Sequence, residues 1–267
     1  MTYRFLYRRE WMMPFTEIKP SMPLYYTTSG SGFPVIFIHP PHMGHHVFKY
    51  QHEVLSKHYQ IITYDLRGHG DSGNTDDHST IQTHSKDLAL FLDNIEIKEA
   101  IIVGYSAGGS IAQDFAIKYP SKVKALVLAG GFSEVSTVLL RTQFHLGMNL
   151  VQNGKSQLLS KLLAKTHKIT LEDQKLVYQD CIKADPQTAY QFYESSMEYK
   201  CTDYLNTIHC PVLLLYGQFS HIRSYEKLYE QHLPLMKSVL ISKALHQLPI
   251  RKYFSFNHAL LNFLKDI

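Results

Sequence analysis

One serine of this chain lies in a pattern that could make it a nucleophile. Residues 104–108 read Gly-Tyr-Ser-Ala-Gly, with Ser106 at the centre. A β-rich run at 100–103 precedes this pattern and a helical stretch at 107–118 follows it, and that context is what makes the pattern informative. The turn between such elements is sharp and strained, so the serine hydroxyl would project beyond a sheet. The alternative is a glycine-rich turn with an incidental serine.

The two neighbours of Ser106 are candidates for contacting a substrate. Because the serine would begin a helix, the backbone N–H of Ala107 has no partner inside that helix and could bind a developing oxyanion. Tyr105, on the other side of the serine, would lie beside the substrate.

One of the 16 histidines is placed to act as a base. His246 follows the last predicted strand and comes after Ser106 in the chain. A free serine hydroxyl is a poor nucleophile near neutral pH, so a histidine that takes its proton and returns it to the leaving group would activate it. We therefore expect His246 to be the general acid–base; a surface histidine is the alternative.

The elements that must position these side chains alternate in type. After an opening hairpin, strands are predicted at 35–38, 61–64, 100–103, 123–129, 211–216 and 238–242, and helices at 46–57, 80–95, 107–118, 224–232 and 252–265. This alternation predicts an α/β fold, with a mostly parallel sheet of about eight strands flanked by helices.

Residues 133–205 break the alternation, since they contain no convincing strand. We expect them to form a helical cap inserted after the sixth strand, at the sheet edge where open α/β folds bind ligands. The core domain would then comprise residues 1–132 and 206–267.

The composition narrows the class of protein. Of the 267 residues, 45% are hydrophobic and 19% charged, as in ordinary globular proteins. The formal charge of +4 comes from scattered residues, so no nucleic-acid partner is expected. No apolar run approaches the ~20 residues that span a bilayer, and no membrane partner is expected.

The cysteines and the N-terminal residues bear on location. The three cysteines have neither zinc-site nor redox spacing, and their odd number favours a reducing cytoplasm. Arginines at 4, 8 and 9 are not followed by an apolar segment, so no secretory signal is expected. Translation could equally start at Met12 or Met13.

Together these features resemble the α/β-hydrolase superfamily over nearly the whole chain. Residues 104–108 match its nucleophile elbow, and His246 matches the position of its catalytic histidine. His39 ends the third strand where the family usually carries His-Gly, and residues 65–72 resemble the turn after its fourth strand. A serine nucleophile argues against dehalogenases and epoxide hydrolases, which use aspartate there.

The resemblance implies a cofactor-free hydrolase of the esterase and lactonase branch. It would cleave an ester, thioester, lactone or related acyl bond of a small to medium substrate, through an acyl-enzyme on Ser106. Two rival functions stay open. One is a ligand-binding or signalling protein on the same fold, and the other is a cofactor-free perhydrolase or oxygenase.

The third member of a catalytic triad is missing from its usual position. The family usually carries an aspartate three residues after the glycine that follows the seventh strand, and here that position is Ser220. Serine cannot supply the negative charge that stabilises an imidazolium. Three explanations stay open: Glu134, after the sixth strand, is the acid; Ser106 and His246 work as a pair supported by Ser220 or water; or the site binds without turnover.

A second departure concerns the oxyanion hole. The residue after the family's His-Gly pair normally donates the second N–H, but here it is Pro41, which has none. A shifted loop could offer the N–H or the imidazole of His42. Alternatively, the proline pair at 40–41 stiffens the loop and Ala107 acts with a weaker partner.

A metal site is a further possibility to weigh. His42, His45 and His46 would share one face of a helix, but no carboxylate or cysteine lies near them in the sequence. We therefore expect a solvated loop at the pocket mouth, with no metal.

Overall fold

The computed structural model describes residues 15–267. Residues 1–14, with the N-terminal arginines and the alternative starting methionines, lie outside the described residues. Within the described part of the chain, no helix has the length and apolar character needed to cross a membrane.

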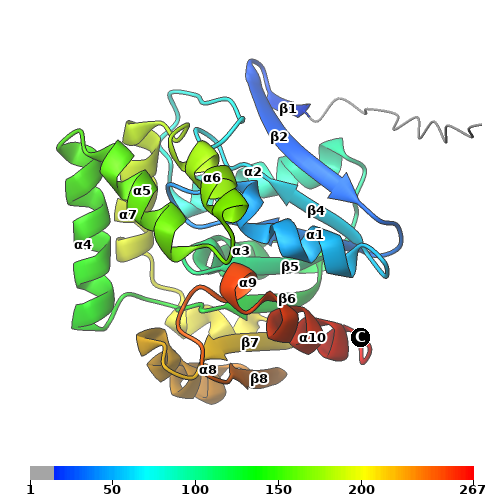
Figure 1. Cartoon of the computed structure of the whole chain (residues 1–267). Helices are drawn as coiled ribbons and strands as arrows, with labels where there is room; N and C mark the ends of the chain where they lie inside the picture. Colours follow the sequence, from blue (N-terminus) through cyan, green and yellow to red (C-terminus); the bar gives the residue numbers. More distant parts are fainter. Residues whose placement is uncertain (1–14) are drawn as a thin grey trace, which may run out of the picture.

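One eight-stranded sheet forms the centre of the molecule (Figure 1), with strand order β1-β2-β4-β3-β5-β6-β7-β8. The strands are β1 (Phe15–Lys19), β2 (Met22–Ser29), β3 (Pro34–Ile38), β4 (Gln60–Tyr64), β5 (Ala100–Tyr105), β6 (Val123–Ala129), β7 (Val212–Gly217) and β8 (Met236–Ile241). Only the pairings of β1 with β2 and of β2 with β4 are antiparallel. The predicted fold class, a mostly parallel sheet of about eight strands, is confirmed.

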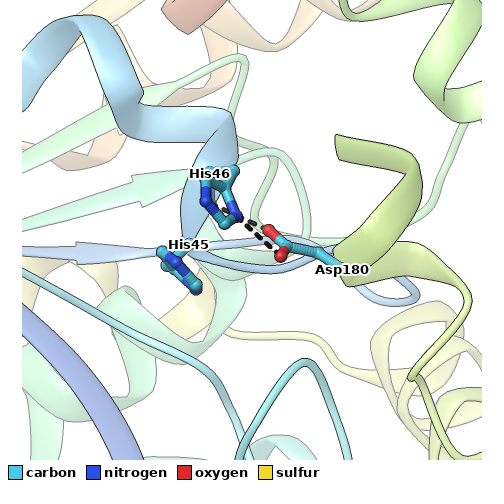
Figure 2. A group of neighbouring side chains, drawn as sticks. All are labelled: His45, His46 and Asp180. Carbon is cyan, nitrogen blue, oxygen red and sulfur yellow. Dashed lines mark hydrogen bonds and ion pairs between the residues drawn. The ribbon is translucent and has the colours of Figure 1, made fainter. Parts of the chain in front are cut away.

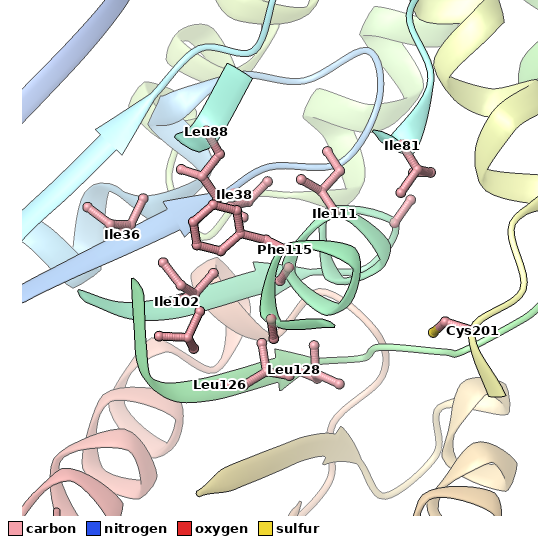
Figure 3. Packing of buried hydrophobic residues seen from close by; sticks show 14 of the residues in the cluster. Ile36, Ile38, Ile81, Leu88, Ile102, Ile111, Phe115, Leu126, Leu128 and Cys201 are labelled. Carbon is pink, nitrogen blue, oxygen red and sulfur yellow. The ribbon is translucent and has the colours of Figure 1, made fainter. Parts of the chain in front are cut away.

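The apolar runs of the central strands supply both faces of this sheet. Every residue of β5 is buried, as expected for a parallel strand covered on both sides. Because side chains alternate along a strand, Ile36 and Ile102 join one core cluster, whereas Val35 and Val103 join the other. Figure 3 shows the first cluster, in which Phe115 packs against this face of the sheet.

Helices cover the two faces separately. On the side of Phe115 lie α2 (Ile81–Asn94), α3 (Gly108–Lys118) and α8 (Glu226–His232), whose buried residues belong to the first cluster. On the other side lie α1 (Lys49–Leu55), α9 (Leu248–Arg251) and α10 (Tyr253–Leu264). In Figure 1, α1, α9 and α10 are in front of the sheet and α3 is behind it.

The segment between β6 and β7 forms four α-helices and the 3-10 helix Thr202–Thr207, and it contains no strand. The α-helices are α4 (Val138–Gln152), α5 (Ser156–Thr166), α6 (Leu171–Cys181) and α7 (Pro186–Glu198). Local signals fix the starts of α6 and α7: the Thr170 side chain accepts from Asp173 N–H in a capping box, and Asp185 caps α7 just before Pro186. We refer to α4–α7 as the helical insertion; it gathers at one end of the sheet (Figure 1).

The predicted helix at 46–57 is not one α-helix. It is a 3-10 turn (His45–Phe48) followed by α1. The backbone N–H groups of His45 and His46 donate to the carboxylates of Asp65 and Asp180. Because these acceptors are distant in sequence, no local pattern could have indicated this start.

Candidate active site

The strained turn at Ser106 is present where β5 meets α3. Ser106 has a φ of +54°, which is uncommon for a residue other than glycine. Its N–H donates to the Ala129 carbonyl at 2.9 Å, so the turn is tied to β6. A Cβ at Gly104 would lie 2.5 Å from Gly109 Cα, and one at Gly108 would lie 2.3 Å from the Ile38 carbonyl. Both glycines are therefore required by close backbone contacts.

His246 lies in the loop between β8 and α9, directly beside the serine. The Ser106 hydroxyl donates to His246 Nε2 at 2.9 Å. Burial, with a smaller contribution from the neighbouring His167 and His221, lowers the pKa of His246 to about 3. The imidazole is therefore neutral at pH 7, as a group that accepts the serine proton must be.

The other ring nitrogen of His246 has no acceptor in the described part of the chain. With Nε2 accepting from Ser106, the proton lies on Nδ1, which is buried without a hydrogen-bond partner within residues 15–267. Gly130, directly after β6, lies against this part of the ring: a Cβ there would be 2.7 Å from Nδ1. The side chain of Ser220 is also buried without a partner among the described residues.

Glu134 is not brought to His246. Its carboxylate accepts from Thr202 Oγ1 at 3.0 Å and lies 3.5 Å from Lys200 Nζ. These contacts tie the segment after β6 to the 3-10 helix Thr202–Thr207, near the end of the insertion. The structure thus gives Glu134 a role in joining two parts of the chain.

The residues considered for the oxyanion hole are divided between the cavity and the insertion. Ala107, at the start of α3, lines the same cavity as Pro41 and Ser106. The imidazole of His42 instead points to α5, with Nε2 3.0 Å from Ser160 Oγ. Burial lowers the pKa of His42 to about 4, so this contact involves a neutral ring.

A cavity of about 360 Å³ contains Ser106 and His246. Its walls are mostly aliphatic and aromatic side chains of the helical insertion: Leu140, Phe144, Leu146, Leu150, Leu159, Leu162, Leu163 and Tyr193. An apolar cavity with few polar groups is the usual form of a small-molecule site. Such walls favour an apolar ligand group.

His167, at the end of α5, is a site residue that the sequence did not single out. Its Nδ1–H donates to the Leu163 carbonyl at 2.9 Å, so Nε2 accepts from the Tyr105 hydroxyl, also at 2.9 Å. Burial lowers the pKa of His167 to about 4. Tyr105 also lines the cavity, and its ring centroid is 5.3 Å from that of His246. A single histidine in a Leu- and Lys-rich stretch gave no signal of this contact.

Two histidines that were considered as metal ligands form hydrogen bonds with distant carboxylates. His45 Nδ1–H donates to Asp65 at 2.9 Å, and His46 Nδ1–H donates to Asp180 at 2.7 Å. Figure 2 shows His46 and Asp180 facing each other across the insertion boundary. Two ligand atoms of a tetrahedral zinc ion would be ~3.3 Å apart. The nitrogen–oxygen distances here are shorter, so they fit direct hydrogen bonds better than a bound metal. His42 lies outside this group.

The ion pair at His45 has an electrostatic basis. Burial alone would lower the pKa of His45, but the hydrogen bond to Asp65 and the charge of that carboxylate outweigh burial and raise it. The side chain of Asp65 is itself fully buried, so a positive partner stabilises it.

Residues 34–250 match the model of a family described as alpha/beta hydrolase fold. A putative carbamate hydrolase, RutD, from Azorhizobium caulinodans is 30% identical over 118 residues, which are 44% of this chain and 44% of that protein. The chain thus spans less than half the length of this curated relative.

Solved structures agree over almost the whole chain. A bromoperoxidase from Bacillus anthracis has a TM-score of 0.84 at 23% identity, covering 94% of this chain and 99% of that one. A thermophilic esterase from Thermogutta terrifontis has a TM-score of 0.80, also at 23% identity, covering 92% and 94%. At these identities the likeness shows a shared fold alone.

Proposed function

Because the chain belongs to the α/β-hydrolase family, we propose that it is a serine hydrolase that cleaves an ester, thioester, lactone or related acyl bond. The observation that carries this proposal is the 2.9 Å hydrogen bond from Ser106 to a neutral His246 inside an apolar cavity. A serine with a base in hydrogen-bond reach is the arrangement that nucleophilic catalysis requires.

The reaction follows from this geometry. Ser106 Oγ attacks the substrate carbonyl carbon while its proton passes to His246 Nε2. The Ala107 N–H stabilises the negative oxygen that forms. His246 then gives the proton to the leaving group, and the carbon–leaving-group bond breaks. A water then attacks the acyl carbon and gives its proton to Nε2. The bond from that carbon to Ser106 Oγ breaks, His246 returns the proton to Oγ, and the acid is released.

The lack of an acceptor at His246 Nδ1 bears on the rate. Each step passes through an imidazolium, which a buried carboxylate normally stabilises, and removing that group in a triad lowers kcat on the order of 10⁴-fold. Here burial lowers the pKa of His246, so the imidazolium is especially unfavourable. We therefore propose an enzyme that forms its acyl intermediate and turns over slowly.

The substrate is a small molecule with an apolar acyl group, as the cavity walls favour. All three cysteines are free, as a reducing cytoplasm would leave them. The relative named as a putative carbamate hydrolase extends the candidate bonds to carbamates.

A fluorophosphonate probe tests the proposal. Ser106 Oγ should bond to the phosphorus of the probe, whose P–F bond breaks; fluoride leaves with the serine proton, and the folded protein gains the phosphonyl mass on Ser106. Ser106→Ala should abolish this labelling, whereas Ser110→Ala, a buried serine of α3, should leave it unchanged. A folded protein that does not label at Ser106 would favour the rival, a binding protein without turnover. A panel of acyl esters with and without peroxide separates hydrolysis from perhydrolysis.

A further inference from the structure

The helical insertion exposes apolar side chains at the cavity. Leu139 and Leu146 of α4 are 53% and 57% exposed, and Leu158 and Leu162 of α5 are 47% and 45% exposed. The spacings of seven and four residues place each pair on one side of its helix. We call these four residues the apolar rim. Exposed apolar groups gathered next to a ligand cavity mark an interaction site more often than a random surface does.

The rim is continuous with the cavity of Ser106. Leu146 and Leu162 line that cavity and are also about half exposed, so they form part of its mouth. Leu139 and Leu158 do not line the cavity. In Figure 1, α4 and α5 lie at the outer edge of the molecule, away from β1 and β8 at the two edges of the sheet.

The charged residues of α4, α5 and the chain segments that flank them are all positive. Residues 135–171 contain no aspartate or glutamate, but they contain Arg141, Lys155, Lys161, Lys165 and Lys168. The formal net charge of this segment is therefore +5, whereas that of the whole chain is only +4. On α5, Lys161 and Lys165 are exposed and lie on the same side of the helix as the two rim leucines.

We propose that this face binds the surface of an anionic lipid assembly. The apolar rim would enter the acyl-chain boundary, and the lysines and arginine would contact the anionic headgroups. This combination of exposed leucines with charged residues that are all basic along α4 and α5 is typical of helices that lie in a membrane interface. The mouth of the cavity then faces the lipid, so an acyl group enters the site directly from it.

Charge complementarity selects this occupant over others. A second copy bound to the same face by twofold symmetry would bring two wholly positive segments together. Nucleic acid would match the charges but would leave four leucines without an apolar partner. The chain would bind the lipid peripherally, which revises the expectation of no membrane partner. Binding needs no catalytic step, so it is independent of the proposed hydrolase activity.

Co-sedimentation with vesicles tests the electrostatic part. The full chain should bind vesicles of phosphatidylcholine mixed with phosphatidylglycerol, and bind phosphatidylcholine alone much more weakly. Salt should weaken the binding, because screening reduces the attraction. Lys161→Glu with Lys165→Glu should weaken it by about tenfold or more, since one basic residue near an anionic surface contributes about fivefold. Lys57→Glu with Lys98→Glu makes the same charge change at exposed positions outside the insertion and should have little effect.

A second pair of variants tests the apolar part. Leu139→Ser with Leu158→Ser should also weaken vesicle binding, while hydrolysis of a short soluble ester stays unchanged because neither residue lines the cavity. Phe254→Ser, at an apolar position on α10 that is even more exposed (75%), should bind as the unmodified chain does. Ser106→Ala should bind normally. Circular dichroism checks that each variant is folded.

Three results would overturn the proposal. One is the absence of binding to anionic vesicles. Another is that the variant Lys161→Glu with Lys165→Glu binds the vesicles as well as the control variant Lys57→Glu with Lys98→Glu. The third is a dimer in gel filtration that the leucine substitutions dissociate, without vesicle binding, since this would assign the face to a second copy.

Discussion

Gly130 and His246 pack so closely that a single methyl group would not fit between them. A Cβ at Gly130 would lie 2.6 Å from His246 Cε1 and 2.7 Å from Nδ1. The backbone directly after β6 therefore holds the imidazole in place, on the ring edge that usually faces a carboxylate. His246 is positioned by steric contact and by Ser106, without a charged partner at Nδ1 in the described residues.

Gly130→Ala should displace the imidazole and lower kcat by about 100-fold or more, because a shift of about 1 Å can cost that much. Gly154→Ala is a matched control, since both glycines have positive φ but a Cβ at Gly154 meets nothing within 4 Å. Each substitution should cost about 1–2 kcal/mol of stability from backbone strain. Rates and urea unfolding of the two variants separate these effects; equal loss of activity would contradict the role of this contact.

Ser220→Asp should raise kcat if the site lacks only its carboxylate. A negative group at the position where the family carries its acid would stabilise the imidazolium and raise the pKa of His246. We expect a gain of about tenfold or more in ester hydrolysis. Ser220→Asn has nearly the same shape without the charge and should not show the gain. A loss of activity in both variants would mean that the serine suits its position.

Glu134→Gln should leave kcat within about twofold of the unmodified chain, because the carboxylate contacts Thr202 and Lys200. The variant should be slightly less stable, by up to about 1 kcal/mol, as expected for a half-exposed ion pair. A tenfold or larger fall in kcat, with the fold intact, would instead indicate that Glu134 is the acid of the catalytic triad.

The free energy of unfolding should fall steeply as the pH drops below about 6.5. Burial lowers the pKa of five histidines to between about 3 and 4: His39, His42, His52, His167 and His246. Between these values and the unfolded pKa near 6.5, the unfolded chain binds more protons than the folded one, so stability decreases with decreasing pH. Burial also lowers the pKa of His69, His84 and His221. His45, whose pKa is raised, opposes this trend, but it is one residue against eight.

Chemical unfolding at several pH values measures this slope. Each of these histidines adds up to about 1.4 kcal/mol per pH unit in that window. Removing one of them, in His52→Asn, should flatten the slope by about that amount. A slope that stays the same in this variant would contradict the argument.

The sequence was sufficient for the fold and the family because both depend on local patterns. The apolar runs of β3, β5 and β7 predict buried parallel strands, and the resemblance to α/β hydrolases is confirmed by the family match. The close contacts at Gly104 and Gly108 were also expected, because the turn requires them wherever a serine follows a strand in this way.

The surroundings of His246 could not be read from the sequence, since they depend on packing between distant segments. Glu134 was a candidate from its position after β6, but position along the chain does not give the direction of a side chain, and Thr202 binds it. His45 and His46 have no carboxylate near them in the sequence. In the folded chain, however, the Asp180 carboxylate lies 2.7 Å from His46 Nδ1, although the two residues are 134 positions apart.

The basic segment of the insertion is a different case. Its charges were read as scattered because lysines and arginines occur along the whole chain, whereas the informative fact is that residues 135–171 lack acidic ones. That fact is in the sequence. Its meaning depends on the leucines, whose exposure only the folded arrangement shows.

The hydrogen bond between Tyr105 and His167 connects α5, at the entrance of the cavity, to the backbone next to the nucleophile. Tyr105 directly precedes Ser106, and His167 ends α5, the helix that carries half of the apolar rim. Both groups are buried, so separating them would leave a hydroxyl without a partner at a cost of about 1–3 kcal/mol. A displacement of α5, for example when this helix docks to a surface, would therefore be transmitted through His167 to Tyr105, the residue next to Ser106.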